Sequence, residues 1–419
     1  MSAASVPAIQ VERELEVAAS NHSAPTPRVR LDYLDGVRGV AALLVAVFHA
    51  GLIIPQGGDY GLWFEDSLAW LWLGRGSVAV FIVLSGYCLM LPVVRSAQGT
   101  LEGGMRGYLV RRAWRILPAY LAALILSVAV LAGLSRFETH RQGWISTMYP
   151  ALDPSVLLSH ALLVHNLHSD WCFKINSPMW SVAVEWQIYF LFPLILIPVW
   201  RRFGSIAAVI VGYVMGIVPV YLFDSLSFGA PWLIGLFAMG MAAAALSDPR
   251  RPQPVRSRHD VGWGWFAGFV FTGWAYAGGN GYGYADPGVG PLAGWKWGAT
   301  VDSVVGAGTL ALLVHCTQSL SASGSGMRSW AVALFESKPA MWLGRFSYSL
   351  YLIHAVVLVS IEALIMRRVF PSRTHAVMIS FGLGIPLALG VSYAFYLAFE
   401  RPFLRRRTAA RLNLHSAGT

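Results

Sequence analysis

Long apolar runs recur along the whole of this 419-residue sequence, and they restrict the folds available to it. The length of each run is close to the about 20 residues that a helix needs to cross a bilayer. Only 12% of the residues are charged and the mean hydropathy is +0.55, whereas soluble domains are about 25% charged. We therefore predict an all-α integral membrane protein with about ten transmembrane helices, near residues 37–55, 74–92, 117–134, 180–200, 205–223, 229–246, 262–278, 299–317, 343–365 and 377–399.

The basic residues indicate how these helices are oriented. With the N-terminus inside, the connections on the inner side hold 22 of the 31 Lys and Arg residues and the outer ones eight, with Arg38 left at the membrane edge. Short cytoplasmic loops are typically enriched in Lys and Arg. We expect both termini in the cytoplasm of a bacterium, in a multi-pass protein of the inner (cytoplasmic) membrane. The net charge of +10 then reflects membrane flanks, and no nucleic-acid partner is expected.

The domain organisation follows from where the apolar runs begin and end. We predict a disordered cytoplasmic tail over 1–30, one transmembrane domain over 31–405 and a basic cytoplasmic tail over 406–419, with neither a signal peptide nor a fused soluble domain. Two long outer connections, 135–179 and 278–294, separate the runs, and the first contains leucines at helical spacing that favour a surface helix. The three cysteines show no metal-ligand spacing, so no metal site is expected.

The first apolar run carries two ionisable residues, Arg38 and His49. Eleven residues at about 100° each place both on nearly one helical face, about 16 Å apart along the axis. If Arg38 lies at the membrane surface, His49 lies near the middle of the bilayer. Ionisable groups at that depth are costly and usually line a cavity or a site. Asp35 precedes Arg38 and could bind substrate.

A second group of basic residues, Arg111, Arg112 and Arg115, opens the third apolar run. Arg112 and Arg115 are three residues apart and are neighbours on one helical face. One interpretation is a positive-inside anchor. The other is an anion clamp, because paired guanidinium groups suit bidentate phosphate binding. The two are compatible.

Polar stripes mark two further runs. Ser181, Glu185 and Tyr189 recur every four residues after Trp180, and a glutamate there is expensive unless it is paired. Glu185 could be protonated for packing, but we favour a cavity role. Tyr351 and His354 share a side of the ninth run with Ser347, and His354 could equally be a core histidine.

Three patterns are weaker. The spacing from His165 to Asp170 matches that of some glycerolipid acyltransferases, and His160, His165 and His168 could suggest a metal site, but both patterns fall in an outer loop. Ser85 lacks the surrounding pattern of a serine hydrolase and is interpreted as a packing residue.

Taken in order, several of these blocks resemble a known family. They are Asp35-Gly-Val-Arg38 with His49, Phe81-Ile-Val-Leu-Ser-Gly-Tyr87, Arg112-x-x-Arg115, Trp180-Ser181-x-x-x-Glu185, Phe346-Ser-Tyr-Ser-Leu-Tyr-Leu-Ile-His354 and Phe399-Glu400-Arg401-Pro402. This ordered set resembles the acyltransferase family 3 membrane proteins, from about residue 31 to 405. Val37 and Tyr87 depart mildly from the residues that are commoner in the family.

The resemblance implies a ten-span enzyme that moves an acyl group, usually from a coenzyme A thioester, to a hydroxyl of a sugar or similar acceptor. Arg112 and Arg115, with Arg111, would hold the phosphates of acyl-CoA (acetyl-CoA as the expected donor), and Arg38 would position it. His49 would act as general base, kept neutral by its apolar surroundings, and Glu185 would orient it. An acyl-His49 relay across the membrane is a variant. Trp180, Ser181, Tyr189, Tyr351, His354 and Asp35 are candidate substrate-binding residues.

The acceptor is narrowed only by analogy. Proteins of this type resemble both surface-polysaccharide O-acylases and enzymes that acylate macrolide-type antibiotics. The sequence has many arginines and only three lysines, a bias that suggests a high-GC bacterial genome, and this favours the second group. The alternative function is a transporter of an amphipathic anion with His49 and Glu185 as a proton relay. The Arg112-x-x-Arg115 pair and the lack of an internal repeat favour the enzyme over the transporter, and a structural scaffold would explain neither His49 nor Glu185.

Overall fold

The described part of the chain is built from helices, and it contains no strand. The computed structural model describes residues 31–54, 73–135, 148, 152–248, 262–279, 294–321, 329–366, 369 and 372–404. The tails predicted at 1–30 and 406–419 and most of the glycine-rich connection at 278–294 lie outside these residues. Helices are expected throughout, because a segment in lipid must satisfy its backbone hydrogen bonds internally.

The helices occur in the following order. They are α2 (Tyr33–Leu52), α4 (Leu73–Arg95), α5 (Gly104–Leu134), α6 (Pro154–Ala161), η3 (His165–Leu167), α7 (Met179–Leu191), η4 (Phe192–Leu196), α8 (Ile197–Leu222), η5 (Asp224–Gly229), α9 (Leu233–Leu246), α10 (Gly262–Gly279), α11 (Trp295–Ser321), α12 (Trp330–Phe335), α13 (Lys338–Arg345), α14 (Ser347–Ile361), η8 (Glu362–Met366), α16 (Arg373–Val377), η9 (Met378–Gly384), α17 (Ile385–Phe395) and η10 (Tyr396–Glu400). The segments η3 and η5 are 3₁₀ turns, and η4, η8, η9 and η10 are π-helical.

Seven helices in the described residues are long and apolar enough to cross a membrane. They are Tyr33–Leu52, Gly76–Arg95, Gly104–Leu134, Met179–Leu222, Trp295–Ser321, Ser347–Met366 and Thr374–Leu404. The runs predicted at 229–246 and 262–278 also form helices, α9 with 14 residues and α10 with 18, but these are not among the seven. The all-helical membrane fold is confirmed, whereas the count of about ten spans stays a prediction.

The longest of the seven, Met179–Leu222, covers two predicted spans. Straight, its 44 residues would extend about 66 Å, more than twice the thickness of a bilayer core. Gly204 interrupts it with φ 87° and ψ −177°, a backbone conformation that glycine adopts readily and other residues avoid. The chain changes direction there, between the spans predicted at 180–200 and 205–223.

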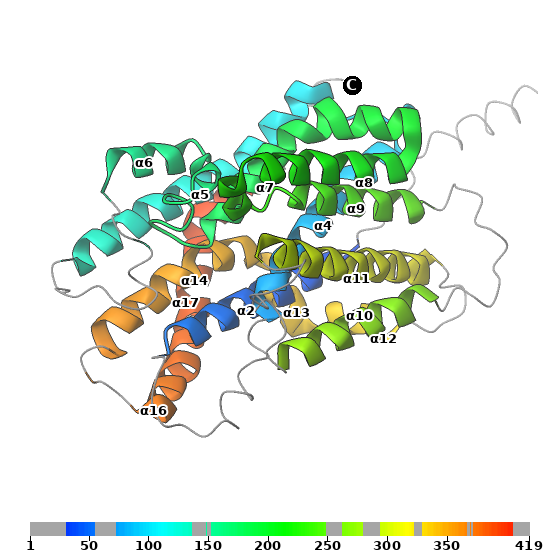
Figure 1. The fold of residues 1–419 in the computed structure, drawn as a ribbon. Coiled ribbons are helices and arrows are strands. Elements are labelled where there is room, and N and C mark those ends of the chain that lie inside the picture. Colours follow the sequence, from blue (N-terminus) through cyan, green and yellow to red (C-terminus); the bar gives the residue numbers. More distant parts are fainter. Residues whose placement is uncertain are drawn as a thin grey trace, which may run out of the picture.

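Helix α4 lies at the centre of the packing (Figure 1), and its contact with α9 is the most extensive between any two elements. Small residues allow this approach: a Cβ added at Gly86 would lie 2.0 Å from the carbonyl oxygen of Phe237, and one at Gly240 would lie 2.0 Å from that of Val83. Close backbone contact of this kind is a main source of attraction between helices in lipid. This contact holds α4 in one rotational position, and thereby sets where the face that carries Ser85 and Cys88 lies.

Helix α2 is held in the same way against α13. A Cβ at Gly39 would lie 2.5 Å from the backbone nitrogen of Gly344, and one at Gly344 would lie 2.2 Å from the carbonyl oxygen of Asp35. Helix α2 also packs on α4 and α14. These contacts place Arg38, one turn from the start of α2, among α4, α5 and α14.

We predict that Gly86→Ala destabilises the protein severely, because the added methyl group meets backbone that cannot move without separating α4 from α9. Overpacking costs about 1–3 kcal/mol where side chains can adjust, and we expect at least the upper end here. Thermal unfolding in detergent tests this. Gly390→Ala, in α17, is the matched control, since its Cβ would meet no atom within 4 Å. Equal melting temperatures for the two variants would contradict this view of the α4–α9 contact.

Candidate active site

Five helices surround a cavity of about 100 Å³. One wall is formed by α2 and α4, the others by α5, α7 and α14. The polar and charged lining residues are Arg38, Ser85, Cys88, Arg112, Arg115, Ser181, Glu185, Tyr189, Ser347, Tyr348 and Tyr351, and the apolar ones are Val78, Phe81, Ile82, Leu89, Ile116 and Val182. A pocket that combines apolar walls with a few converging polar groups is the usual form of a small-molecule site.

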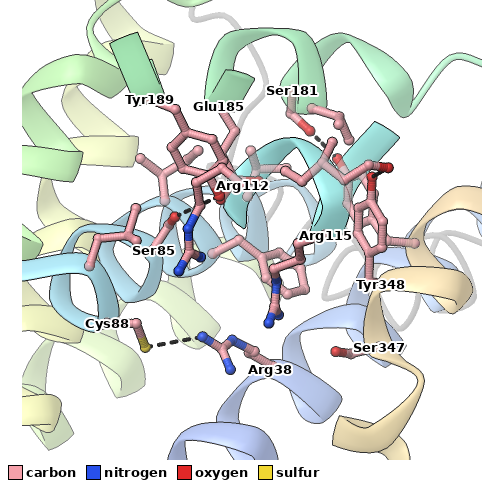
Figure 2. A pocket seen from close by; sticks show the side chains of 17 residues that line it. Arg38, Ser85, Cys88, Arg112, Arg115, Ser181, Glu185, Tyr189, Ser347 and Tyr348 are labelled. Carbon is pink, nitrogen blue, oxygen red and sulfur yellow. Dashed lines mark hydrogen bonds between the residues drawn. The ribbon is translucent and has the colours of Figure 1, made fainter. Parts of the chain in front are cut away.

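Three guanidinium groups point into this cavity from different directions (Figure 2). Arg38 is held by its neighbours: Nη1 donates to Asp35 Oδ1 at 3.2 Å, and Nη2 donates to the sulfur of Cys88 at 3.0 Å. Arg112 and Arg115 lie within 4 Å of no carboxylate in the described residues. The lining itself holds three guanidinium groups and one carboxylate, that of Glu185, while Asp35 pairs with Arg38 from outside the lining.

Arg112 has unused hydrogen-bonding capacity. Its Cζ atom lies 6.0 Å from the ring centroids of both Tyr108 and Tyr189, so the two rings flank the guanidinium. Its Nε is buried and has no hydrogen-bond partner in the described structure. A buried donor without an acceptor costs about 1–3 kcal/mol, so an oxygen of a ligand would be stabilised there.

The stripe predicted on the fourth run faces the cavity from α7. The hydroxyl of Tyr189 donates to Glu185 Oε1 at 2.6 Å, and the same hydroxyl lies 3.3 Å from Ser85 Oγ. Ser181 Oγ lies 2.5 Å from the hydroxyl of Tyr351 and thus joins α7 to α14. Glu185 is consequently hydrogen-bonded to Tyr189, and Ser181 and Tyr351 are bonded to each other.

A second carboxylate lies behind the arginines. Glu400 ends the π-helical segment η10, is buried, and accepts a hydrogen bond of 2.5 Å from Ser349 Oγ. The segment η10 packs against α5, the helix that carries Arg115. Glu400 belongs to the closing block seen in the sequence, and the structure shows that this block brings a buried carboxyl group to that helix.

The two histidines of the site lie together, beyond the arginine cavity. His49 is in the last turn of α2, and its Nδ1 lies 2.9 Å from the carbonyl oxygen of Val45 and 3.2 Å from Nε2 of His354. Neither histidine is among the residues that line the cavity. Tyr351 connects the two regions, because it lines the cavity and its ring centroid lies 6.1 Å from that of His354.

The sequence-predicted residues thus fall into groups. Arg38, Arg112, Arg115, Ser181, Glu185, Tyr189 and Tyr351 share one cavity, and His49 and His354 pair beside it. Asp35 serves as the partner of Arg38. Arg111 does not line the cavity: its Nη2 donates to the carbonyl oxygen of Glu102, in the loop before α5. Trp180 is half-buried and also lies outside the lining.

Sequence reasoning missed several lining residues. Ser85, interpreted as a packing residue, and Cys88 line the cavity, as does Tyr348. A signal for the first two was present, since Phe81, Ser85 and Cys88 follow one another at helical spacing on one face of α4. A charged residue inside a membrane run, such as Glu400, is a similar signal.

The histidines of the connection at 135–179 do not gather into the metal site that their spacing could suggest. His160 and His165 are buried and stacked, with ring centroids 3.8 Å apart, whereas His168 and Asp170 are exposed. No group of three or more metal-ligating side chains occurs in the described residues. Burial lowers the pKa of His160 to about 4 against the opposing effect of two facing carbonyl oxygens, and burial with the neighbouring His160 lowers the pKa of His165 to about 2.

Comparison with known proteins now places the chain. The family model of the acyltransferase domain of family 3 matches residues 31–397, which is most of the sequence. The chain therefore belongs to this acyltransferase family, and the resemblance seen in the sequence is confirmed. The matched range contains every helix that contributes to the cavity and the histidine pair.

Curated relatives are distant and longer. The chain is 26% identical over 350 residues to the "Putative peptidoglycan O-acetyltransferase YrhL" of Bacillus subtilis (strain 168), covering 78% of this chain and 48% of the relative. It is 22% identical over 412 residues to a "Putative O-acetyltransferase" of Staphylococcus aureus (strain MRSA252), covering 92% and 59%. A match at 22% identity to the peptidoglycan O-acetyltransferase OatA of Listeria monocytogenes covers 39% and 24%. The chain thus spans about half the length of the first two relatives. No solved structure matches it significantly.

We predict that the stability of the protein falls as the pH drops below about 6.5, and that His165 is one cause. The unfolded histidine binds a proton near pH 6.5, whereas the folded one stays neutral down to about pH 2, so each pH unit between these values costs about 1.4 kcal/mol. In thermal unfolding scans, His165→Phe should weaken this pH dependence. His168→Phe, at an exposed histidine, should not. Identical pH slopes for the wild type and His165→Phe would disprove the assignment.

Proposed function

We propose that this protein is a membrane O-acetyltransferase that moves an acetyl group from acetyl-CoA to a hydroxyl of a carbohydrate, in a glycan or in a glycosylated natural product. The observation that carries the proposal is the buried, unpartnered Nε of Arg112, in a cavity that Arg38 and Arg115 also enter. Coenzyme A carries phosphate groups whose oxygens would satisfy such donors, at one end of a long and largely uncharged pantetheine arm.

We propose an orientation for acetyl-CoA in the cavity, from its phosphates at the arginines to its thioester near the histidines. Its phosphates would lie between Arg112 and Arg115, and its pantetheine arm would follow the apolar lining of α4 toward Phe81 and Tyr351. The thioester would then approach the histidine pair, because Tyr351 packs against His354. Coenzyme A is cytoplasmic, so the arginine end of the cavity is proposed to face the cytoplasm. This orientation agrees with the positive-inside distribution of Lys and Arg and places both termini inside.

The chemistry would be direct acyl transfer with His49 as general base. The acceptor hydroxyl attacks the thioester carbonyl carbon while His49 removes its proton. The tetrahedral intermediate expels the coenzyme A thiolate, which takes the proton back from His49, so that the products are an acetyl ester and free coenzyme A. In the alternative, His49 attacks the thioester itself and passes the acetyl group on, with the same products.

The acceptor class rests on two supports. Two curated relatives, from Bacillus subtilis and Listeria monocytogenes, carry names that refer to peptidoglycan O-acetylation, although the matches cover only 48% and 24% of their lengths. The arginine-rich composition, which suggests a high-GC bacterial genome, favours the sugar of a natural product instead. Both are carbohydrate hydroxyls, and the assay below separates them.

The direct test is acceptor-dependent release of coenzyme A from acetyl-CoA by the purified protein. Peptidoglycan oligosaccharides and a glycosylated macrolide serve as the two acceptors, and mass spectrometry detects the added acetyl group. We predict release with one acceptor class and its loss in His49→Ala, by about 100-fold or more as expected when a general base is removed. Transport of acetyl-CoA or a similar anion without release would contradict the proposal, as would full activity in a folded His49→Ala.

We further predict that Arg112→Leu raises the KM for acetyl-CoA by about 10- to 100-fold, the effect of losing one charged hydrogen-bonding partner. The kcat should change less, because the histidines do not line the cavity that Arg112 enters. Arg106→Leu, an exposed arginine on the same helix, is the matched control. An unchanged KM in Arg112→Leu, measured by initial rates over a range of donor concentrations, would remove Arg112 from the donor site.

A further inference from the structure

The histidine pair is built so that the proton positions of both rings are determined. His354 is fully buried in α14, and its Nδ1 lies 2.8 Å from the carbonyl oxygen of Leu350, one helical turn earlier. A carbonyl oxygen only accepts hydrogen bonds, so Nδ1 of His354 must carry a proton. In the neutral ring, Nε2 of His354 then holds a lone pair, and this atom lies 3.2 Å from Nδ1 of His49.

His49 is determined by the same reasoning. Its Nδ1 lies 2.9 Å from the carbonyl oxygen of Val45, so this nitrogen also carries a proton. That proton is shared between the carbonyl of Val45 and the lone pair of His354. The nitrogen of neutral His49 that can accept a proton is consequently Nε2. Both helical carbonyls and the contact between the rings are satisfied when each ring is protonated at Nδ1.

We propose that His354 is a positioning residue for His49, and that it is not in contact with substrate. The inference rests on the proposed function, in which His49 accepts a proton from the acceptor hydroxyl. When Nε2 of His49 takes that proton, the ring becomes an imidazolium whose Nδ1–H is shared between the carbonyl oxygen of Val45 and the lone pair of His354. His354 thereby orients the base and stabilises its charged form, the task of the third member of a catalytic triad.

The surroundings explain why this task falls to a histidine. Tyr351 and His49 cover the His354 ring, with centroids 6.1 Å and 4.9 Å away, so the side chain cannot turn toward the cavity without losing both contacts. A carboxylate at this fully buried position would add a full charge inside an apolar helix, which is costly in a membrane. A neutral imidazole supplies the lone pair without that cost.

The test uses three substitutions of His354 that distinguish the contribution of its Nδ1 from that of its Nε2. Asn at position 354 can keep the hydrogen bond to the carbonyl of Leu350 but is too short to reach His49. Gln places an oxygen acceptor near the position of Nε2, and Leu provides neither group. For His354→Leu and His354→Asn we expect kcat for acetyl transfer to fall about 100-fold, the lower range for a general base, with the KM for acetyl-CoA unchanged. His354→Gln should recover about tenfold of the loss, as one restored hydrogen bond predicts.

Three results would overturn the proposal. The first is a KM effect on the acceptor with kcat unchanged, which would make His354 a binding residue. The second is His354→Asn at least as active as His354→Gln, which would make the bond to Leu350, a purely structural contact, the one that matters. The third is full activity in His354→Leu. If the wild type transfers acetyl groups and His49→Ala does not, while His354→Leu is fully active, this inference fails and the proposed function stands.

A second measurement does not depend on activity. In protein labelled with ¹⁵N-histidine, the nitrogen signals of His49 and His354, assigned through their substitutions, report which nitrogen is protonated. We expect a proton on Nδ1 of both rings and none on Nε2 of His354 at neutral pH. A proton on Nε2 of His354 would contradict the geometry on which the proposal rests, whether or not the protein is a transferase.

Discussion

The structure depends on placing three arginine side chains inside a helical bundle without matching each with a carboxylate. Charged groups in such surroundings persist only where other groups stabilise them. Arg38 has Asp35 and the sulfur of Cys88, and α5, the helix of Arg115, packs against the segment that ends in the buried Glu400. Arg112 has two aromatic rings and one donor without an acceptor. Compensation at Arg112 is therefore incomplete, and an oxygen of a bound ligand would complete it.

The packing of the helices makes this arrangement rigid. Helices α4 and α9 meet at Gly86 and Gly240 with no room for a methyl group, and α2 and α13 meet in the same way at Gly39 and Gly344. Side chains carried on backbone that is fixed to this degree keep their spacing. Helix α2 carries both Arg38 and His49, so the distance between this arginine and the proposed base is a property of the fold.

Much of this was predictable from the sequence, for physical reasons. Hydrophobic period and length predict membrane helices, and helical spacing alone places Arg112 beside Arg115 and aligns Ser181, Glu185 and Tyr189 on one cavity wall. What spacing cannot predict is contact between distant segments. The pairing of His49 with His354, separated by 305 residues, and of Ser181 with Tyr351 depends on how helices pack. For the same reason Arg111, adjacent to Arg112 in sequence, could not be assigned to the loop that it contacts.

We propose that the arginine cavity receives the phosphate end of an acyl-CoA donor whose thiol end points toward the histidine pair. A cryo-electron microscopy structure of the protein with bound coenzyme A would test this placement. We expect phosphate oxygens within hydrogen-bonding distance of Arg112 and Arg115, and the coenzyme A sulfur beyond Phe81 and Tyr351, beside His49. Coenzyme A bound elsewhere, or entering with its thiol toward the arginines, would contradict this placement.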